Sequence, residues 1–329
     1  MIKKIFIIIL VIIILVMALF FIGNPPKPEK IIWGVNFSQK HAQNLELDWK
    51  ESYSALIDEL GVRNIRLAVN WDLIEPGKGK YDFSDLDWQV TKAEEKGVNI
   101  VPAIGMKTPR WPECHVPQWA KNLSKEDQQK EILEMLKEIV KRYNGSSSIK
   151  KWQVENEPFF PFGECQWADK DFLKKEIDLV KSLDEQKRPI VISDSGEGSL
   201  WVEAAKLGDI VGVTMYRKVW FSQFKNYIDY RLPPIFYWRK AEIIKAFFNK
   251  KVICIEFQAE PWGPKLLYDT SLEEQGKTMN LAQFQKNIEF AKKTGFDEFY
   301  LWGGEWWYWM KEKQNKPEIW NEAGKLFKI

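Results

Sequence analysis

The chain has 329 residues, which is long for one ordinary domain but normal for a barrel built from eight strand–helix units. Lys and Arg total 48 and Asp and Glu total 46, so the net charge is only +2, with the two signs interspersed along the chain. This balance excludes the concentrated basic surface of a nucleic-acid-binding protein, and we expect no nucleic-acid partner.

The N-terminus predicts a membrane anchor. Lys3 and Lys4 precede an unbroken apolar run from Ile5 to Ile22, which as a helix would be ~27 Å long, close to the thickness of the hydrocarbon core of a bilayer. The run ends in bulky residues, whereas a cleaved signal peptide ends in small ones. We therefore expect an uncleaved, single-pass signal anchor over residues 1–23 in the cell membrane, with the main domain outside the cytoplasm; a removed signal peptide is the alternative. Residues 24–30 are rich in proline and predict a stiff tether.

Short apolar runs alternate with amphipathic stretches from residue 31 onward. The expected strands are Ile31–Phe37, Asn64–Asn70, Val98–Gly105, Lys151–Asn156, Pro189–Ser193, Ile210–Tyr216, Val252–Phe257 and Glu298–Gly303. The expected helices include Trp49–Leu60, Leu86–Lys96, Lys125–Tyr143, Asp171–Leu183, Ala241–Asn249 and Leu281–Lys293. Eight alternations predict an α/β fold, a parallel sheet closed into a (β/α)8 barrel over residues 31–329. The alternative, an open doubly wound sheet, would want a glycine-rich phosphate loop after an early strand, and Gly34-Val-Asn-Phe is not one.

Two glutamates stand at the ends of two of these strands. The run Trp152-Gln-Val-Glu-Asn-Glu-Pro stops at Pro158 and places Asn156 and Glu157 at the C-terminal end of the fourth strand. The seventh run ends in the same way with Glu256. The chemistry of such barrels is at the C-terminal ends of the strands, and two carboxylates on different strands are the minimum apparatus for cleaving a glycosidic bond.

These strand ends resemble glycoside hydrolase clan A, a group of retaining (β/α)8-barrel glycosidases with cellulase-like and β-galactosidase-like members. Five matches in strand order carry the resemblance, namely Arg66, Asn156-Glu157-Pro158, Tyr216, Glu256 and Trp302. The segment Trp71-Asp-Leu-Ile-Glu-Pro-Gly-Lys after the second strand adds to it, and the likeness covers nearly all of residues 31–310. The resemblance implies that Glu157 is the general acid/base and Glu256 the nucleophile, with retention of the anomeric configuration.

The chemistry of the residue types fits these roles. Glu157 must be protonated to give its proton to the leaving oxygen, so we expect surroundings that raise its pKa. Glu256 must stay ionised to attack, and Arg66 and Tyr216 are its candidate partners. Asn156 is the candidate donor to the 2-hydroxyl of the sugar, an interaction that strengthens in the transition state.

Each carboxylate has a rival. Glu155 shares the strand parity of Glu157 and could be the inward residue instead. Glu260, which has its own Glu-Pro pair, competes with Glu256, although four residues further along it already lies in a loop.

Other residues on the same face are candidate sugar contacts, because aromatic rings pack well against the apolar faces of sugars. Trp302 would form the floor of the subsite that holds the reacting sugar. The remaining candidates, each equally compatible with loop packing, are Trp111, His115, Glu305 and Trp262. No spacing of His, Cys and acidic residues suggests a metal cage, so we expect neither a metal nor a cofactor.

Three cysteines are too few for a disulfide scaffold. Cys114 and Cys165 follow the third and fourth expected strands, so a bridge between them would brace two neighbouring loops beside the site. Two unpaired thiols are the alternative. Cys254 lies inside an apolar run and is expected to be buried.

Together these features predict a retaining glycoside hydrolase that acts on a β-linked oligo- or polysaccharide outside the cytoplasmic membrane, by default as a monomeric ectodomain. One alternative is a transglycosylase that uses the same site with a sugar hydroxyl as acceptor. Another is a catalytically inactive, glycan-binding envelope protein.

The aromatic-rich residues 219–238 predict a long sixth loop that matches no particular substrate group.

Overall fold

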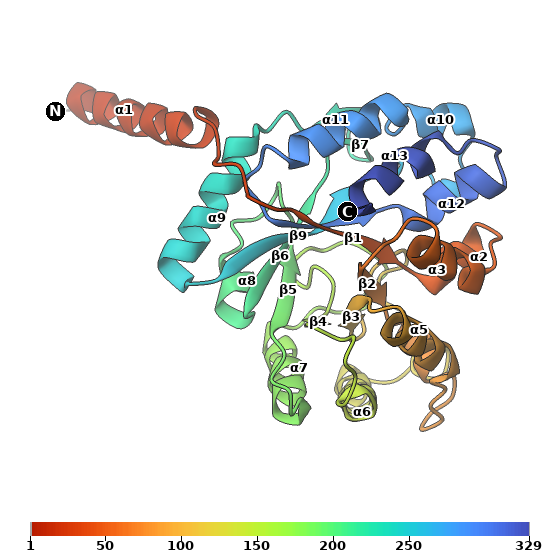
Figure 1. Ribbon diagram of the computed structural model, residues 1–329. Coiled ribbons are helices and arrows are strands. Elements are labelled where there is room, and N and C mark those ends of the chain that lie inside the picture. Colours follow the sequence, from red (N-terminus) through yellow and green to blue (C-terminus); the bar gives the residue numbers. More distant parts are fainter. Residues whose placement is uncertain (1, 329) are drawn as a thin grey trace.

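The eight apolar runs of the sequence form eight parallel strands that close into a barrel, as predicted (Figure 1). The computed structural model describes residues 2–328. In chain order the barrel strands are β1 (Ile32–Phe37), β2 (Asn64–Ala68), β3 (Asn99–Ile104), β4 (Trp152–Val154), β5 (Ile190–Asp194), β6 (Ile210–Met215), β9 (Lys251–Gln258) and β10 (Glu298–Trp302). Around the barrel they pair in the order β1-β10-β9-β6-β5-β4-β3-β2, and β2 closes on β1.

The strands are apolar on both faces because the barrel has two cores. A large outer cluster packs the strands against the surrounding helices. A small inner cluster fills the barrel itself, with Val101, Val191, Ile253 and Tyr300 among its members. Parallel strands buried on both sides produce the continuous apolar runs that made them visible in the sequence.

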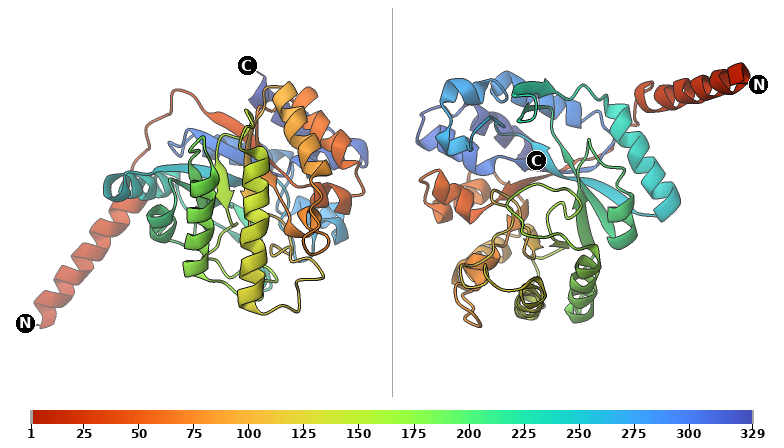
Figure 2. Two further views of the ribbon diagram at one scale, coloured as in Figure 1. Left: turned by 90° about the horizontal axis from the view of Figure 1, so that it is seen from below. Right: turned by 180° about the vertical axis from the view of Figure 1, so that it is seen from behind.

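Helices surround the barrel on the outside (Figure 2). They are α2 (Gln39–Asn44), α3 (Trp49–Asp58), α4 (Trp71–Ile74), α5 (Ser84–Glu95), α6 (Lys125–Tyr143), α7 (Lys170–Leu183), α8 (Val202–Leu207), α9 (Pro234–Phe248), α10 (Leu272–Gly276), α11 (Leu281–Ala291), α12 (Gly304–Glu312) and α13 (Glu318–Phe327), with a 3-10 turn at Leu267–Asp269. The six predicted helices correspond to α3, α5, α6, α7, α9 and α11.

The segment predicted as a long sixth loop has regular structure. It forms a two-stranded antiparallel hairpin of β7 (Lys218–Phe221) and β8 (Asn226–Asp229), followed directly by α9. Helix α9 begins at Pro234, seven residues before the predicted start, because the fixed φ of proline suits the first turn of a helix.

The predicted N-terminal helix forms as α1 (Ile2–Phe21), which projects away from the barrel (Figure 1). Its last turn packs on α9, with the rings of Phe20 and Phe21 each 5.9 Å from that of Phe236. The predicted role of α1 as a membrane span is not supported, because no helix in the described part of the chain is both long and apolar enough to cross a bilayer. Residues 24–30 form neither helix nor strand and lead into the N-terminal end of β1.

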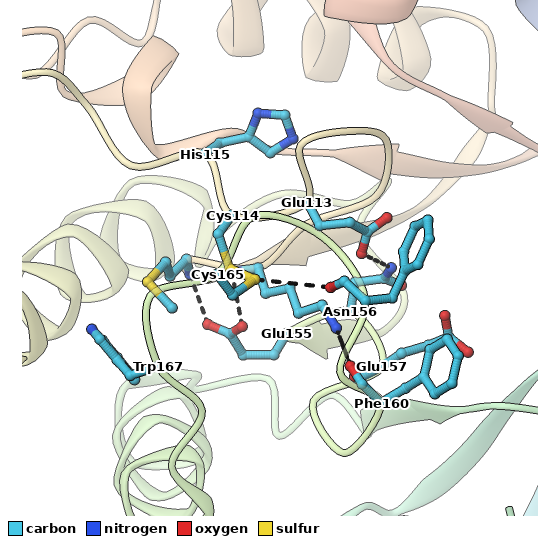
Figure 3. The surroundings of a disulfide bond; sticks show 12 residues. Glu113, Cys114, His115, Glu155, Asn156, Glu157, Phe160, Cys165 and Trp167 are labelled. Carbon is cyan, nitrogen blue, oxygen red and sulfur yellow. Dashed lines mark hydrogen bonds between the residues drawn. A yellow bond between two sulfur atoms is a disulfide. The ribbon is translucent and has the colours of Figure 1, made fainter. Parts of the chain in front are cut away.

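Cys114 and Cys165 form a disulfide bond, which confirms the predicted bridge (Figure 3). The bond joins the loop after β3 to the loop after β4. The two loops also share a backbone hydrogen bond, from the Glu164 N–H to the Pro112 carbonyl at 2.9 Å. Cys254 is buried, as expected.

We expect loss of this disulfide to lower the free energy of unfolding by about 2–4 kcal/mol, because a cross-link that closes a long loop restricts the unfolded chain. Urea unfolding of the Cys114→Ser/Cys165→Ser variant beside the wild type measures the difference. A reducing agent should bring the wild type down to the variant and leave the variant unchanged. Equal stability of the two proteins under oxidising conditions would contradict the expectation.

Candidate active site

Glu256 lies near the C-terminal end of β9, where a β-bulge sets the direction of its side chain. Val213 of β6 pairs with Cys254, but the next residue, Thr214, pairs with Glu256, so β9 carries one extra residue, Ile255. The pairing of β9 with β10 shifts at the same place. Ile255 belongs to the apolar cluster inside the barrel, so strict alternation would turn Glu256 outward. The bulge instead aims its carboxylate into the barrel mouth, a common use of bulges at active sites.

Two donors hold the Glu256 carboxylate. Arg66 donates from Nη1 to Oε2 at 2.9 Å, and the Tyr216 hydroxyl donates to Oε1. Both partners were predicted from the sequence. A guanidinium and a phenol that donate to the two oxygens of a carboxylate fix it in one orientation, as attack on a carbon atom requires.

Arg66 of β2 is fully buried and contacts residues of three other strands, β1, β4 and β9. Besides Glu256, its Nη1 donates to Asn36 Oδ1 at 2.9 Å, and its Nε donates to Gln153 Oε1 at 2.8 Å. Its Nη2 donates to Asn156 Oδ1 at 2.6 Å. The guanidinium therefore sets the relative positions of Glu256 and Asn156.

Glu157 follows β4 in an unusual backbone conformation, with φ at +40°. Its N–H donates to the Ser193 hydroxyl of β5 at 2.8 Å, and the Thr214 hydroxyl of β6 lies 3.4 Å from its Oε1. Thr214 is also the residue that pairs with Glu256 across the sheet, so Glu157 is contacted from the strand next to Glu256. Non-glycine residues with positive φ persist only where their surroundings hold them, and they cluster at functional sites.

The surroundings of Glu157 favour its protonated form. Burial raises the pKa of Glu157 well above its ordinary value, and the negative charges that Glu256 and Glu113 carry when ionised raise it further. The structure thus places one carboxyl beside a cation and the other among like charges, which is how paired acids acquire different roles.

The rival carboxyls point elsewhere. Glu155 accepts hydrogen bonds from the backbone N–H groups of Met106 and Lys107 at 2.7 and 2.8 Å, and it faces Glu176 of α7 rather than the barrel mouth. Glu260 pairs with Arg110. Burial opposes ionisation of Glu260, but Arg110 outweighs it, with help from His41, and lowers the pKa of Glu260 to about 2.

Two predicted sugar contacts are occupied by protein groups. Glu305 is fully buried; its Oε1 accepts from the Ser38 N–H at 2.6 Å and its Oε2 from Arg110 at 3.0 Å. His115 lies against Lys40, with 3.2 Å between Nδ1 and Nζ, and Figure 3 shows its ring directed away from Glu157. Burial and the Lys40 ammonium lower the pKa of His115 to about 4, so it is neutral.

The predicted tryptophans lie around the mouth of the barrel. The ring of Trp262 is 5.1 Å from that of Tyr216 and 5.7 Å from that of Phe162. Trp111, which is 41% exposed, also packs on Phe162, with 5.9 Å between the ring centres. Phe162 belongs to the loop after β4, and Trp262 to the segment after β9, so their contact crosses the mouth.

Trp302 is buried and covered on one face by a cation. The guanidinium carbon of Arg110 lies 3.8 Å from the centre of its ring. Arg110 belongs to the loop after β3, which is opposite β9 in the barrel, so it too reaches across the mouth to Glu260. The role of Trp302 as the floor of a sugar subsite stays a prediction.

Sequence reasoning missed several residues of this site, among them Lys107, Arg110 and Glu113. Lys107 donates from Nζ to the backbone carbonyls of Glu157 and Phe160 at 3.0 and 2.7 Å, which fixes the start of the loop after β4. Glu113 contacts Asn156. Of these three residues, only Glu113 has a sequence feature that could have indicated its role, because it directly precedes Cys114, which was expected to brace a loop beside the site.

No group of three or more His, Cys, Asp or Glu side chains within residues 2–328 is arranged to hold a metal ion.

The chain is similar to known glycosidases. The family model described as Glycosyl hydrolase family 10 matches residues 32–175, less than half of the chain, a segment that contains Glu157 but not Glu256. Endo-1,4-beta-xylanase 3 from Hypocrea jecorina is 24% identical over 182 residues, which is 53% of this chain and 49% of the relative. The chain therefore spans about half the length of the curated relatives it matches.

Solved structures share the fold. A β-galactosidase from the Antarctic haloarchaeon Halorubrum lacusprofundi matches with a TM-score of 0.57 at 14% identity, over 83% of this chain and 52% of that one. A family 10 endo-β-1,4-xylanase from Gloeophyllum trabeum matches with a TM-score of 0.55 at 17% identity, over 83% and 84% of the two chains. The fold and the family model together confirm the resemblance to glycoside hydrolase clan A.

Proposed function

We propose that this chain is a retaining glycoside hydrolase that cleaves O-glycosidic bonds of a β-linked glycan by double displacement. Glu256 is the nucleophile and Glu157 the general acid/base. The observation that carries the proposal is the contrast between the two buried carboxyls: Arg66 and Tyr216 both donate to Glu256, while burial and nearby negative charge favour the protonated form of Glu157.

In the first step, Glu157 gives its proton to the glycosidic oxygen while Glu256 attacks the anomeric carbon. The carbon–oxygen bond to the leaving group breaks and a glycosyl ester of Glu256 forms. In the second step, the Glu157 carboxylate takes a proton from a water molecule, the water oxygen attacks the anomeric carbon, and the ester bond breaks to return Glu256. Asn156, whose Oδ1 is held by Arg66, is placed to donate an N–H to the 2-hydroxyl of the reacting sugar.

The test is turnover by the full-length chain on aryl β-glycosides and on a panel of β-glycans that includes xylan and β-galactan. The Glu157→Gln/Glu256→Gln variant is the control. Proton NMR of the first-formed anomer should show the β-sugar, as retention requires. Chromatography of the products distinguishes hydrolysis from transfer to a second sugar. A folded wild type that binds glycans as tightly as the control and turns none over would overturn the proposal.

Rates should depend on pH as a bell-shaped curve. Activity falls on the alkaline side as Glu157 loses its proton, and because the pKa of Glu157 is raised, this limb should lie well above the ordinary range of a glutamic acid. On the acid side, activity falls because a nucleophile of this kind attacks only as a carboxylate. Measuring kcat/KM across pH on one aryl glycoside checks this, and a flat profile from acid to neutral pH would contradict it.

We infer that the barrel acts outside the cytoplasm. The disulfide between Cys114 and Cys165 supports this placement, because such bonds form and persist in oxidising compartments. Labelling of the intact cell surface with an impermeant reagent, followed by detection of the chain, tests it.

A further inference from the structure

A third carboxyl group, Glu113, contacts the site but has no part in the double displacement. Its side chain is 5% exposed, and its Oε2 accepts a hydrogen bond from Asn156 Nδ2 at 2.7 Å (Figure 3). The other end of the same amide, Asn156 Oδ1, accepts from Arg66. The Asn156 amide is therefore held at both ends in one orientation, with a single N–H left over.

The backbone holds Glu113 in place at some cost. Its φ is +70°, although it is not a glycine. Its carbonyl accepts from the Thr108 N–H at 2.9 Å, and its N–H donates to the Arg110 carbonyl at 2.7 Å. The next residue, Cys114, is the one tied to Cys165. Strained residues that are held from several sides are frequent at functional sites.

The loop after β4 is shaped to fit Glu113. A Cβ atom added at Gly163 would lie 2.5 Å from the Cβ of Glu113, and Gly163 has a φ of +96°. Only glycine allows the two loops to approach so closely. The disulfide, the glycine and the strained backbone all serve to place one carboxyl beside Asn156.

We propose that Glu113 is a positioning residue, which orients the Asn156 amide so that its remaining N–H faces the 2-hydroxyl of the reacting sugar. The inference rests on the proposed function. An asparagine amide can turn by half a rotation at little cost, and the turned form would present oxygen instead of N–H. Arg66 can only donate, so it excludes that form, and the Glu113 oxygen that accepts from Nδ2 fixes the direction of the amide nitrogen.

The charged groups that face Glu113 come from several elements: Lys107 after β3, Glu157 after β4, Glu256 on β9 and Arg66 on β2. Burial raises the pKa of Glu113 to about 8. At neutral pH the group is therefore mainly a neutral acid whose carbonyl oxygen accepts from Asn156, and glutamine reproduces that state in shape and charge.

The experiment compares Glu113→Ala and Glu113→Gln in the full-length chain, on an aryl β-glycoside and on its 2-deoxy analogue. For Glu113→Ala we expect kcat on the 2-hydroxy substrate to fall roughly tenfold, which corresponds to the loss of about one hydrogen bond. KM should change little. On the 2-deoxy analogue, which lacks the hydroxyl that Asn156 contacts, kcat should hardly fall. Glu113→Gln should restore kcat at neutral pH. Its alkaline limb should lie at lower pH than in the wild type, because the negative charge that Glu113 acquires above its pKa no longer helps to keep the proton on Glu157.

Equal losses on the 2-hydroxy and 2-deoxy substrates would overturn the proposal, since they would show a general structural effect. So would a Glu113→Gln variant as slow as Glu113→Ala. A wild type that turns over neither substrate would instead count against the proposed function. In that case, infrared difference spectra between wild type and Glu113→Gln still test whether Glu113 is a buried neutral acid that accepts from Asn156. The signal of a protonated carboxyl that disappears as the pH rises through about 8 supports this assignment, and absence of the signal at neutral pH overturns it.

Discussion

Replacing Glu256 with alanine should reduce hydrolysis by a factor on the order of 10⁴ or more, because the variant can form no glycosyl ester and the remaining groups only bind and polarise the substrate. The cavity left by the side chain should admit a small anion beside Arg66 and Tyr216, the two donors that hold the carboxylate in the wild type. Azide should therefore restore turnover of an activated aryl glycoside and yield the α-glycosyl azide. Product identification by NMR reports the nucleophile and the stereochemistry in one measurement.

Glu260 provides the matched control for this experiment. It is the rival carboxylate of the same segment, equally buried, but it forms an ion pair with Arg110. Glu260→Ala should weaken the fold, because it leaves part of the charge of a buried guanidinium unpaired, and azide should not rescue it. Rescue by azide in the Glu260 variant but not in the Glu256 variant would transfer the role of nucleophile to Glu260.

The barrel could be predicted because its strands are buried on both faces. All eight runs kept their positions within a few residues, including β4, which has only three residues in strand conformation. The hairpin of β7 and β8 could not be predicted in the same way. Its strands have four residues each and are partly exposed, so they lack both the length and the apolar run that identify a barrel strand.

The catalytic pair could be predicted from residue type and strand order, but the directions of the side chains could not. Glu256 faces the barrel mouth only because Ile255 forms a bulge, and a bulge has no fixed pattern in a sequence. Glu155 and Glu157 share the same strand parity, yet both have positive φ values and point to different sides. Backbone conformations of this kind depend on the contacts around them.

Site residues that belong to loops could not be identified from the sequence for another reason. Arg110 crosses the barrel mouth to meet Glu260 and Glu305, which follow it by 150 and 195 residues in the chain. Neither local propensity nor periodicity reports contacts at such separations. Glu305, predicted as a sugar contact, instead balances the charge of Arg110.

Replacing Glu157 with glutamine should lower kcat by about 10²–10⁴-fold for glycosides with poor leaving groups, which is the usual contribution of a general acid. The loss should shrink for a dinitrophenyl glycoside, because a stable phenolate departs without a proton. The alkaline limb of the pH profile should disappear with the group that causes it. Azide should accelerate the variant and yield the β-glycosyl azide, since the glycosyl ester on Glu256 still forms and the anion replaces the water that Glu157 would have activated.

Glu155→Gln is the control, because this carboxyl lies only two residues away but faces Glu176 and the backbone of the loop after β3. Its variant should keep both the alkaline limb and the response to leaving groups, whatever it loses in stability. If Glu157→Gln lost activity equally on good and poor leaving groups, Glu157 would not be the acid, and its raised pKa would then reflect its surroundings without a catalytic role. The slope of log kcat against leaving-group pKa decides between these cases, because only removal of the proton donor makes that slope steeper.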